Sequence, residues 1–192
     1  MKKLSGNKKT KTAVFISGRG SNLKNLIKFS KFKKSPIKID LVISNNRNSK
    51  GLLYALQNKI EKKIINFNKI NKDEKKVLKI LSKKKIKLIC LAGFMKILPK
   101  NFIKKFRGKI INIHPSLLPK YKGLNTHKRA LKNNENYSGC TVHYVTSKLD
   151  SGKIILQKKV RIKKNDTIFS LQKKILNEEY KIYPKAISKI LN

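Results

Sequence analysis

Short apolar runs that alternate with helix-like patterns are the feature that most constrains the fold of this chain. Four such runs span residues 12–17, 37–44, 87–92 and 109–114. Continuous apolar runs of this length are typical of parallel strands that are buried on both faces. The helical patterns between the runs supply the crossovers that parallel strands need. The sequence therefore predicts an α/β fold.

The remaining segments complete this prediction. A short strand is expected at 63–67, and two further strands at 138–146 and 153–160 are expected to form a hairpin. Helices are expected at 73–84, from Pro99 to Phe106, from a Thr126 cap to Leu131, and from an Asp166 cap to Leu191, with Pro184 kinking or restarting the last. Together they predict one three-layer domain over 1–192, with a mostly parallel, mixed sheet and a Rossmann-like N-terminal half.

Asn112 and His114 occupy the end of the fourth apolar run, in the stretch KIINIHPSLLPKY. Residues two apart on a strand point to the same face, so both side chains are expected to enter one cavity. An amide and an imidazole there suit oxyanion stabilisation and acid/base chemistry, with a purely structural histidine at the strand end as the alternative. Because Pro115 and Pro119 must turn the chain back past the site, we expect a cis Leu118–Pro119 bond.

A glycine-rich turn, Gly18-Arg19-Gly20-Ser21-Asn22, separates the first strand from the first helix. Backbone N–H groups at such a turn form a phosphate site. Leu23 stands where the dinucleotide fingerprint requires its third glycine, and the Walker pattern is absent. The turn therefore favours a single phosphomonoester, with a plain tight turn as the alternative.

The run at 87–92 ends in an apolar loop that includes Phe94, Met95, Ile97 and Leu98. Exposed apolar residues at the end of a strand are unusual unless they line a binding pocket. We therefore expect a flat hydrophobic ligand at this loop.

The net charge of +40 raises the alternative of a basic RNA-binding protein. The lysines are spread along the whole chain and are not interleaved with aromatic residues, as in single-strand binding platforms. Lysine, isoleucine and asparagine all have A/T-rich codons, so the charge indicates a composition bias. We expect no specific nucleic-acid partner, and attraction of small anions instead.

Cys90 and Cys140 have no zinc spacing and indicate buried thiols in a reducing compartment. The basic start of the chain lacks the apolar segment of a signal peptide, and no run reaches the length of a membrane span. The expectation is a cytoplasmic protein with no membrane partner and no bound metal.

Four segments together resemble the folate-dependent glycinamide ribonucleotide formyltransferase family. They are ISGRGSNL at 16–23, LAGFMKIL at 91–98, NIHPSLLPKYKGLNTH at 112–127 and the Asp150-Ser151-Gly152 turn. The resemblance implies the formyltransferase-type fold. It also implies transfer of a formyl group from 10-formyltetrahydrofolate, as cosubstrate, to the amine of glycinamide ribonucleotide in purine biosynthesis.

The resemblance also implies the roles of individual residues. The catalytic residues would be Asn112, His114 and Asp150, with Asp150 orienting the histidine and helping to move the proton of the amine. The substrate would be bound by Gly18, Gly20, Ser21, Asn22, Leu23, Lys24 and Glu179. The folate would be bound by Lys72, Phe94, Met95, Lys96, Ile97, Leu98 and Asn112. His143 is expected to be a structural histidine.

Other formyltetrahydrofolate-using enzymes are the nearest alternatives. Methionyl-tRNA formyltransferase has a similar Asn, His and Asp set but needs a second domain, for which 192 residues leave no room. Lys96 stands where the family is expected to have arginine, and Asn125 where some members have histidine. The chain also lacks the C-terminal tail of longer members. The expected assembly is a monomer or a homodimer.

Overall fold

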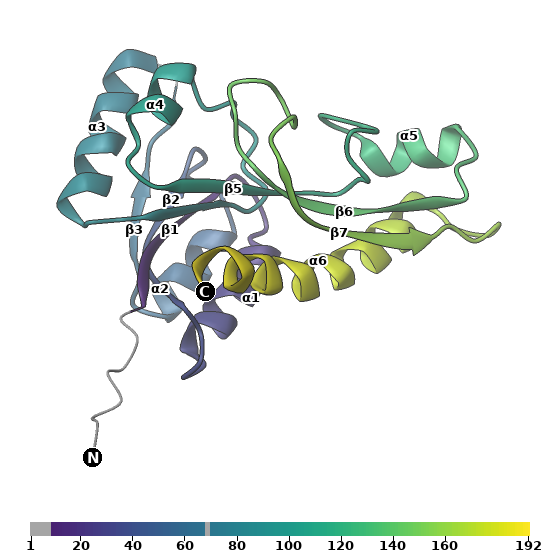
Figure 1. Cartoon of the computed structure of the whole chain (residues 1–192), viewed down its shortest axis with the longest axis horizontal. Coiled ribbons are helices and arrows are strands. Elements are labelled where there is room, and N and C mark those ends of the chain that lie inside the picture. The colour runs from purple at the N-terminus through teal and green to yellow at the C-terminus, as the bar shows by residue number, and fades with distance from the viewer. Residues whose placement is uncertain (1–8, 68–69) are drawn as a thin grey trace.

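The protein folds around a single seven-stranded sheet (Figure 1). The structure is a computed structural model that describes residues 9–67 and 70–192. The strands are β1 (Thr10–Ile16), β2 (Ile37–Ser44), β3 (Glu61–Ile64), β4 (Leu88–Leu91), β5 (Lys109–His114), β6 (Tyr137–Tyr144) and β7 (Ile154–Arg161). The helices are α1 (Ser21–Lys31), α2 (Gly51–Gln57), α3 (Ile70–Lys83), α4 (Lys100–Lys105), α5 (Thr126–Lys132) and α6 (Ile168–Leu191).

The strand order is β3-β2-β1-β4-β5-β6-β7, and it explains where a ligand can bind. The strands from β3 to β5 are parallel, whereas β6 pairs antiparallel with β5 and β7 with β6. The chain order reverses between β1 and β4, and open α/β sheets bind ligands at such a switch point. The predicted mixed, mostly parallel sheet is confirmed.

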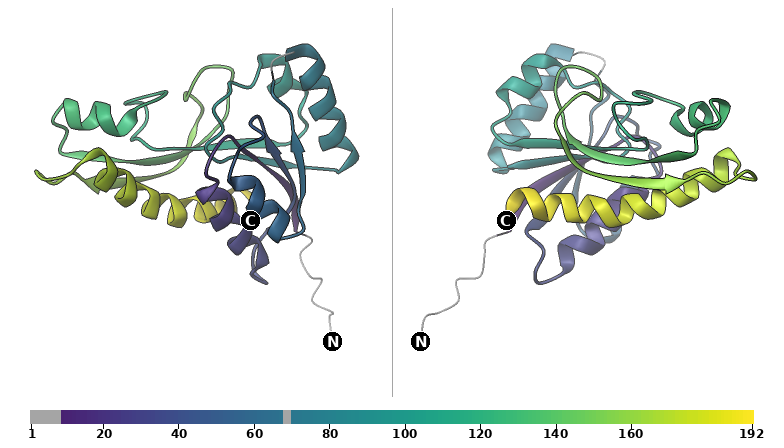
Figure 2. Two further views of the ribbon diagram at one scale, coloured as in Figure 1. Left: turned by 180° about the vertical axis from the view of Figure 1, so that it is seen from behind. Right: turned by 45° about the vertical axis from the view of Figure 1, so that its right-hand side comes forward.

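Helices cover both faces of the sheet, which gives the predicted three layers (Figures 1 and 2). Along β1, Ala13 and Phe15 join the core beneath α3 and α4, whereas Val14 and Ile16 join the core beneath α1, α2 and α6. This alternation is the period of a strand buried on both faces. It accounts for the continuous apolar run in the sequence.

The structure corrects several predicted boundaries. The third strand lies two to three residues earlier than the predicted 63–67, at Glu61–Ile64. The N-cap of α5 is Asn125, in a left-handed conformation, whereas the sequence predicted Thr126 as the cap. Thr167 caps α6 by a capping box with Ser170, so the prediction of Asp166 as the cap was wrong. Asp166 lies one residue before the N-cap and still stabilises the start of α6, because its carboxylate accepts a hydrogen bond from Ser170 Oγ at 2.7 Å.

Helix α6 continues through Pro184, so the predicted restart does not occur. Proline has no N–H, and the carbonyl of Tyr180 therefore lacks its helical partner. Asn25 of α1 supplies the missing donor, because its Nδ2 lies 2.8 Å from the Tyr180 oxygen. The α1–α6 contact thus compensates for the proline.

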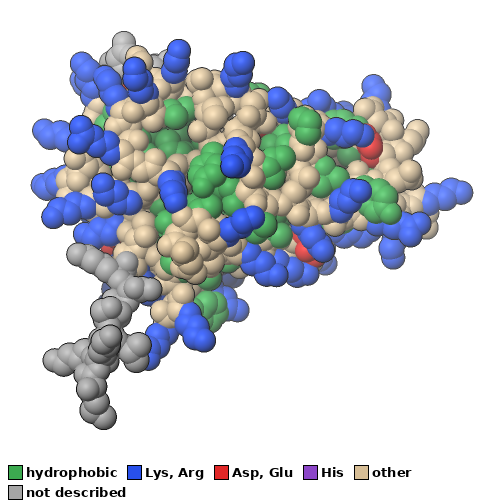
Figure 3. Space-filling view, in the orientation of Figure 1, with side chains coloured by type: hydrophobic (Ala, Val, Ile, Leu, Met, Phe, Trp, Pro, Cys, Tyr) green, Lys and Arg blue, Asp and Glu red, His purple; other side chains and the backbone are tan. Residues whose placement is uncertain are grey.

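Both cysteines are buried and free, as predicted. Within residues 9–67 and 70–192, no helix is long and apolar enough to cross a membrane. Lysine and arginine side chains project over the face shown in Figure 3, separated by apolar and neutral side chains. This face carries a distributed charge, which agrees with the spread of lysines along the sequence.

Candidate active site

The candidate site lies at the C-terminal ends of β1, β4 and β5, around the switch point. The glycine turn follows β1, the apolar loop follows β4, and His114 is the last residue of β5. Ser17 connects two of these segments, because its hydroxyl accepts from Met95 N at 2.7 Å and its N–H donates to Gly93 O at 3.1 Å. The sheet therefore gathers three of the segments that the sequence singled out.

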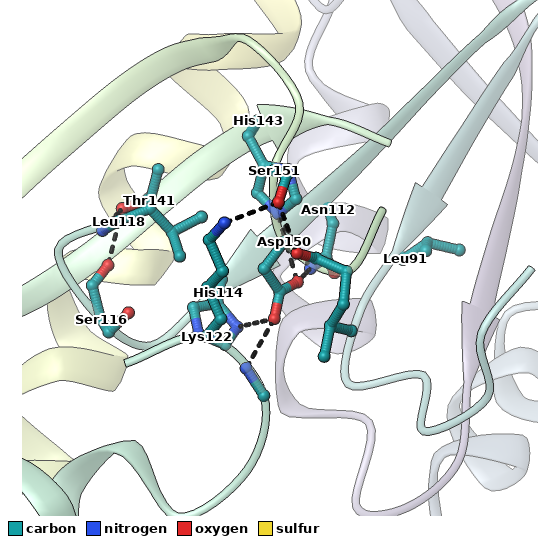
Figure 4. A network of polar contacts seen from close by, with 12 residues as sticks. Leu91, Asn112, His114, Ser116, Leu118, Lys122, Thr141, His143, Asp150 and Ser151 are labelled. Atoms are coloured by element: carbon teal, nitrogen blue, oxygen red, sulfur yellow. Dashed lines mark hydrogen bonds and ion pairs between the residues drawn. The ribbon is translucent and has the colours of Figure 1, made fainter. Parts of the chain in front are cut away.

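Asp150 lies between the side chains of Asn112 and His114 (Figure 4). Asp150 Oδ2 is 3.4 Å from His114 Nδ1 and accepts from Gly123 N at 2.9 Å. Asp150 Oδ1 is 3.5 Å from Asn112 Nδ2. The predicted proximity of the acid to the pair on β5 is confirmed.

His143 on β6 also belongs to this cluster, although the sequence indicated a structural role for it. Its Nδ1 is 2.9 Å from the Tyr144 carbonyl oxygen, so Nδ1 carries the proton and Nε2 is an acceptor. Asn112 Nδ2 donates to that Nε2 at 3.2 Å. Burial lowers the pKa of His143, which favours this neutral form. His143 therefore determines which end of the Asn112 amide faces Asp150.

The sequence offered no signal that would have placed His143 in this cluster. The antiparallel register of β5 and β6 places His143 directly opposite Asn112. A hairpin alternation alone does not reveal which strand the hairpin joins, so the pairing was not accessible from the sequence.

The proline-containing segment after β5 is held against β6 and β7. The Leu118–Pro119 bond is cis, as predicted. Thr141 Oγ1 accepts from Leu118 N at 3.1 Å and donates to Ser116 O at 2.6 Å, and Gln157 Nε2 donates to Leu118 O at 2.9 Å. These bonds hold the segment that leads from His114 to Gly123.

The glycine turn has the geometry of an anion site. Gly20 precedes α1 with φ 74°, and a Cβ there would lie 2.5 Å from the Gly51 Cα. A Cβ on Gly18 would meet nothing within 4 Å. The N–H groups of Ser21, Asn22 and Leu23 belong to the first turn of α1, where backbone donors have no helical acceptor. Since the Leu23 side chain is in the core, only its backbone can face a ligand.

Asn22 and Glu179 form a buried pair beside this turn. Asn22 Nδ2 donates to Glu179 Oε2 at 2.6 Å, while the buried Asn22 Oδ1 has no partner among the described residues. Burial raises the pKa of Glu179 to about 7, partly offset by the hydrogen bond from Asn22. An unpartnered buried oxygen is costly, so a hydrogen-bond donor on a ligand would be favoured here. The exposed Lys24 lies on the same helix, 5.5 Å from the Tyr54 ring centroid.

A pocket opens beside the cluster of Asn112, His143 and Asp150. Its lining includes four of the predicted folate contacts on the β4 loop, together with Asn112, and extends to the β6–β7 connection; the residues are Leu91, Phe94, Lys96, Ile97, Leu98, Asn112, His143, Val145, Thr146, Lys148, Leu149 and Asp150. Phe94 is anchored from behind by edge-on contacts with Phe15 and Phe67, both at 5.4 Å between centroids. The pocket therefore combines apolar walls with a polar end.

Two predicted folate contacts do not line this pocket. Met95 is exposed at the tip of the loop. Lys72 lies on the exposed side of α3. Conversely, sequence reasoning missed Val145, Thr146, Lys148 and Leu149, which reach the pocket only because the hairpin joins β5. Across the described part of the chain, no three His, Cys, Asp or Glu side chains are grouped as metal ligands.

Comparison with known proteins agrees with this geometry. The formyl transferase family model matches residues 10–187. The chain is 43% identical to a phosphoribosylglycinamide formyltransferase of Haemophilus influenzae, over 92% of this chain and 85% of that protein. It is also 43% identical to the human trifunctional purine biosynthetic protein adenosine-3, over 94% of this chain but only 18% of that protein.

Solved structures give the same result. The crystal structure of phosphoribosylglycinamide formyltransferase from Anaplasma phagocytophilum superposes with a TM-score of 0.89, at 42% identity over 96% of this chain and 87% of that chain. The structure from Brucella melitensis has a TM-score of 0.90 at 37% identity, and covers 96% of both chains. The chain therefore belongs to the phosphoribosylglycinamide formyltransferase family.

Proposed function

We propose that the protein transfers the formyl group of 10-formyltetrahydrofolate to the amine of glycinamide ribonucleotide. The observation that carries this proposal is the placement of Asp150 between Asn112 and His114, at the end of β5 and beside an apolar pocket. The family membership of the chain supports the same reaction. The apolar pocket and the glycine turn differ in chemistry, as the two substrates do.

The pocket suits the flat ring of the folate. Phe94, Ile97, Leu98 and Leu149 supply apolar contact area, and the polar edge of a pteridine can face the Asn112 and Asp150 end. Lys96 and Lys148 line the same pocket and place positive charge near the anionic tail of a folate. When bound, the cosubstrate supplies the formyl carbon that the amine attacks.

The glycine turn and the Asn22–Glu179 pair suit the ribonucleotide. The first-turn N–H groups of α1 and the positive end of the helix would hold the ribose phosphate. The unpartnered Asn22 Oδ1 would accept from a hydroxyl of the ribose, and Glu179 lies next to it. A ribonucleotide held in this way would extend its amine toward the cluster at the end of β5.

The cluster stabilises charge during the transfer. Asn112 donates to Asp150 at 3.5 Å, the long limit of a hydrogen bond, so it can exchange this contact for the formyl oxygen. His114, held by the Asp150 carboxylate, would stabilise the negative charge that develops on that oxygen. Asp150 would accept the proton of the attacking amine, directly or through water, and the folate nitrogen would take up that proton as its bond to the formyl carbon breaks. Neither buried cysteine is needed as a nucleophile.

A spectrophotometric assay of formyl transfer tests the proposal. The purified chain is incubated with 10-formyl-folate, with and without glycinamide ribonucleotide, and the rate is compared with that of the Asp150→Asn variant. The Asp166→Asn variant is the matched control, because it changes an aspartate that contacts Ser170 and Lys174 at the start of α6. We expect transfer that depends on the ribonucleotide and fails only in Asp150→Asn.

The same assay addresses the alternatives. Transfer to methionyl-tRNA, without transfer to glycinamide ribonucleotide, would assign the chain to a different acceptor. The net charge of +40 is the one observation that favours a basic RNA-binding protein. Filter binding at two salt concentrations checks it, because purely electrostatic RNA binding weakens steeply with salt. RNA binding that persists at physiological salt, together with no formyl transfer, would overturn the proposal.

A further inference from the structure

The backbone carbonyl of Tyr121 determines how the imidazole of His114 is oriented. Its oxygen lies 2.9 Å from His114 Nε2, which donates to it. The other ring nitrogen, Nδ1, then faces Asp150 Oδ2 at 3.4 Å (Figure 4). The hydrogen bond at one nitrogen of a histidine sets the proton position at the other. A displaced Tyr121 carbonyl would therefore disturb the contact with Asp150.

This carbonyl belongs to a backbone segment with an unusual conformation. Tyr121, Gly123 and Asn125 all have positive φ angles, of 57°, 77° and 57°. A left-handed conformation is unfavourable for a side chain as bulky as that of tyrosine, and it persists only where surrounding contacts hold it. The contacts of the Tyr121 side chain are therefore expected to maintain the position of its carbonyl.

The Tyr121 side chain is anchored on α5 and the turn that follows it. Its hydroxyl donates to Glu135 Oε1 at 2.8 Å and accepts from Asn133 Nδ2 at 3.0 Å. The Arg129 guanidinium lies over the ring, 5.1 Å from its centroid, and also donates to Lys122 O at 2.7 Å. Three polar or cationic groups thus contact the side chain of Tyr121, which does not itself line the pocket.

Glu135 is the central acceptor of this anchor. Lys120 Nζ lies 2.9 Å and 3.1 Å from its two oxygens, in addition to the Tyr121 hydroxyl. These hydrogen bonds lower the pKa of Glu135, so it remains a charged acceptor at neutral pH. Glu135 is one of only nine acidic residues in the chain. Glu135 therefore connects Lys120 and Tyr121 to the turn that follows α5.

We infer that Tyr121 is a positioning residue for His114, and that Glu135 holds it in place through the tyrosine hydroxyl. The inference rests on the role of His114 in the proposed function. It predicts that a change in Glu135, which does not contact the candidate catalytic cluster, alters the rate of formyl transfer but not the binding of substrates.

The decisive variant is Tyr121→Phe, which removes the hydroxyl and retains the ring beneath Arg129. We expect kcat to fall at least about fivefold, since small displacements of a catalytic group are costly, while both KM values stay within about twofold. Glu135→Ala should have the same effect. The double variant should be no slower than either single variant, because both changes break the same hydrogen bond.

Rescue separates positioning from a loss of stability. Glu135→Gln keeps an oxygen for the Tyr121 hydroxyl, so kcat should return to within about twofold of the wild type. Glu61→Ala is the matched control, since Glu61 holds Lys63 and Lys84 at the opposite edge of the sheet. In NMR spectra, the His114 Nε2–H proton should exchange with water faster in Tyr121→Phe than in Glu61→Ala.

Two results would overturn the inference. One is a folded Tyr121→Phe variant with kcat and His114 proton exchange like those of the wild type. The other is Glu135→Gln as slow as Glu135→Ala, which would assign the effect to charge. If Tyr121→Phe fails to fold, Glu135→Ala and Glu135→Gln give the same comparison. A wild-type chain without formyl transfer would count against the proposed function, and the proton exchange of His114 would still test the positioning.

Discussion

Asp150 Oδ2 lies 3.4 Å from His114 Nδ1, although His114 ends β5 and Asp150 belongs to the connection between β6 and β7. The two meet because β6 pairs antiparallel with β5, with Tyr144 opposite Ile111, and the β6–β7 connection then folds back to the end of β5. Asp150 adopts a positive φ of 44° there. This conformation directs the carboxylate toward the cluster and is one that asparagine also tolerates.

The Asp150→Asn variant should lose turnover while retaining substrate affinity. Asparagine fits the left-handed backbone and the hydrogen bond from Gly123 N, so the fold is preserved. The variant lacks the carboxylate that is proposed to accept the proton of the amine, so kcat should fall by about 10²–10⁴-fold. Measurement of kcat and both KM values checks this. A kcat within about threefold of the wild type would contradict the catalytic assignment of Asp150.

Gly18→Ala should weaken binding of the ribonucleotide without damage to the fold. A methyl group at Gly18 meets no atom within 4 Å but would lie at the proposed phosphate site. Calorimetric titration should show weaker affinity for the ribonucleotide and nearly unchanged affinity for the folate. Gly20→Val would confuse the result, because its Cβ would collide with the Gly51 backbone. If Gly18→Ala weakened the affinity for both ligands equally, the turn would have a structural role and would not be the phosphate site.

The free energy of unfolding should fall as the pH rises from about 4.5 to about 7, because of Glu179. Burial raises its folded pKa from 4.5 to about 7, so the folded state holds a proton that the unfolded state has released. Each pH unit in that window costs up to about 1.4 kcal/mol. Urea unfolding of Glu179→Gln should lack this dependence. The control Glu178→Gln, which changes a residue paired with Lys181, should follow the wild-type profile.

Asn25→Ala should destabilise the protein by about 1 kcal/mol, because the Tyr180 carbonyl loses its donor. In a Pro184→Ala background, Asn25→Ala should lower the free energy of unfolding by less. Alanine restores the backbone N–H that can bond to Tyr180 within the helix. Denaturant midpoints of the four variants complete the cycle. Equal losses in both backgrounds would show that Asn25 does not compensate for Pro184.

Ile97→Ser should raise the KM for the folate and leave the KM for the ribonucleotide unchanged. Ile97 lines the pocket and is 66% exposed, so the substitution removes apolar contact with little effect on stability. Leu53→Ser on α2 changes a similarly exposed residue, 57% exposed, that does not line the pocket. Steady-state kinetics of both variants test the assignment. Parallel changes in the two variants would argue against a folate contact at Ile97.

Local chemistry made several features accessible from the sequence. The alternation of apolar runs with helical patterns predicted the parallel strands, since strands buried on both faces carry apolar residues at every position. The spacing of Asn112 and His114 predicted side chains that act together, and both contact Asp150, but of the two only Asn112 lines the pocket. The glycine turn was correctly predicted to lie between β1 and α1. The ends of helices were harder to predict from the sequence. Asp166 and Thr167 are both good N-cap residues, and only the backbone conformation selects Thr167.

The tertiary structure alone decided which distant groups meet. The pairing of β6 with β5 placed His143 opposite Asn112, and the return of the hairpin placed Asp150 against His114. The α1–α6 packing joined Asn22 to Glu179 and supplied Asn25 to the Tyr180 carbonyl. Patterns in a sequence report contacts between near neighbours along the chain, because periodicity and capping are local properties. Contacts between segments far apart depend on strand order and register, and in this protein they determine the geometry of the site.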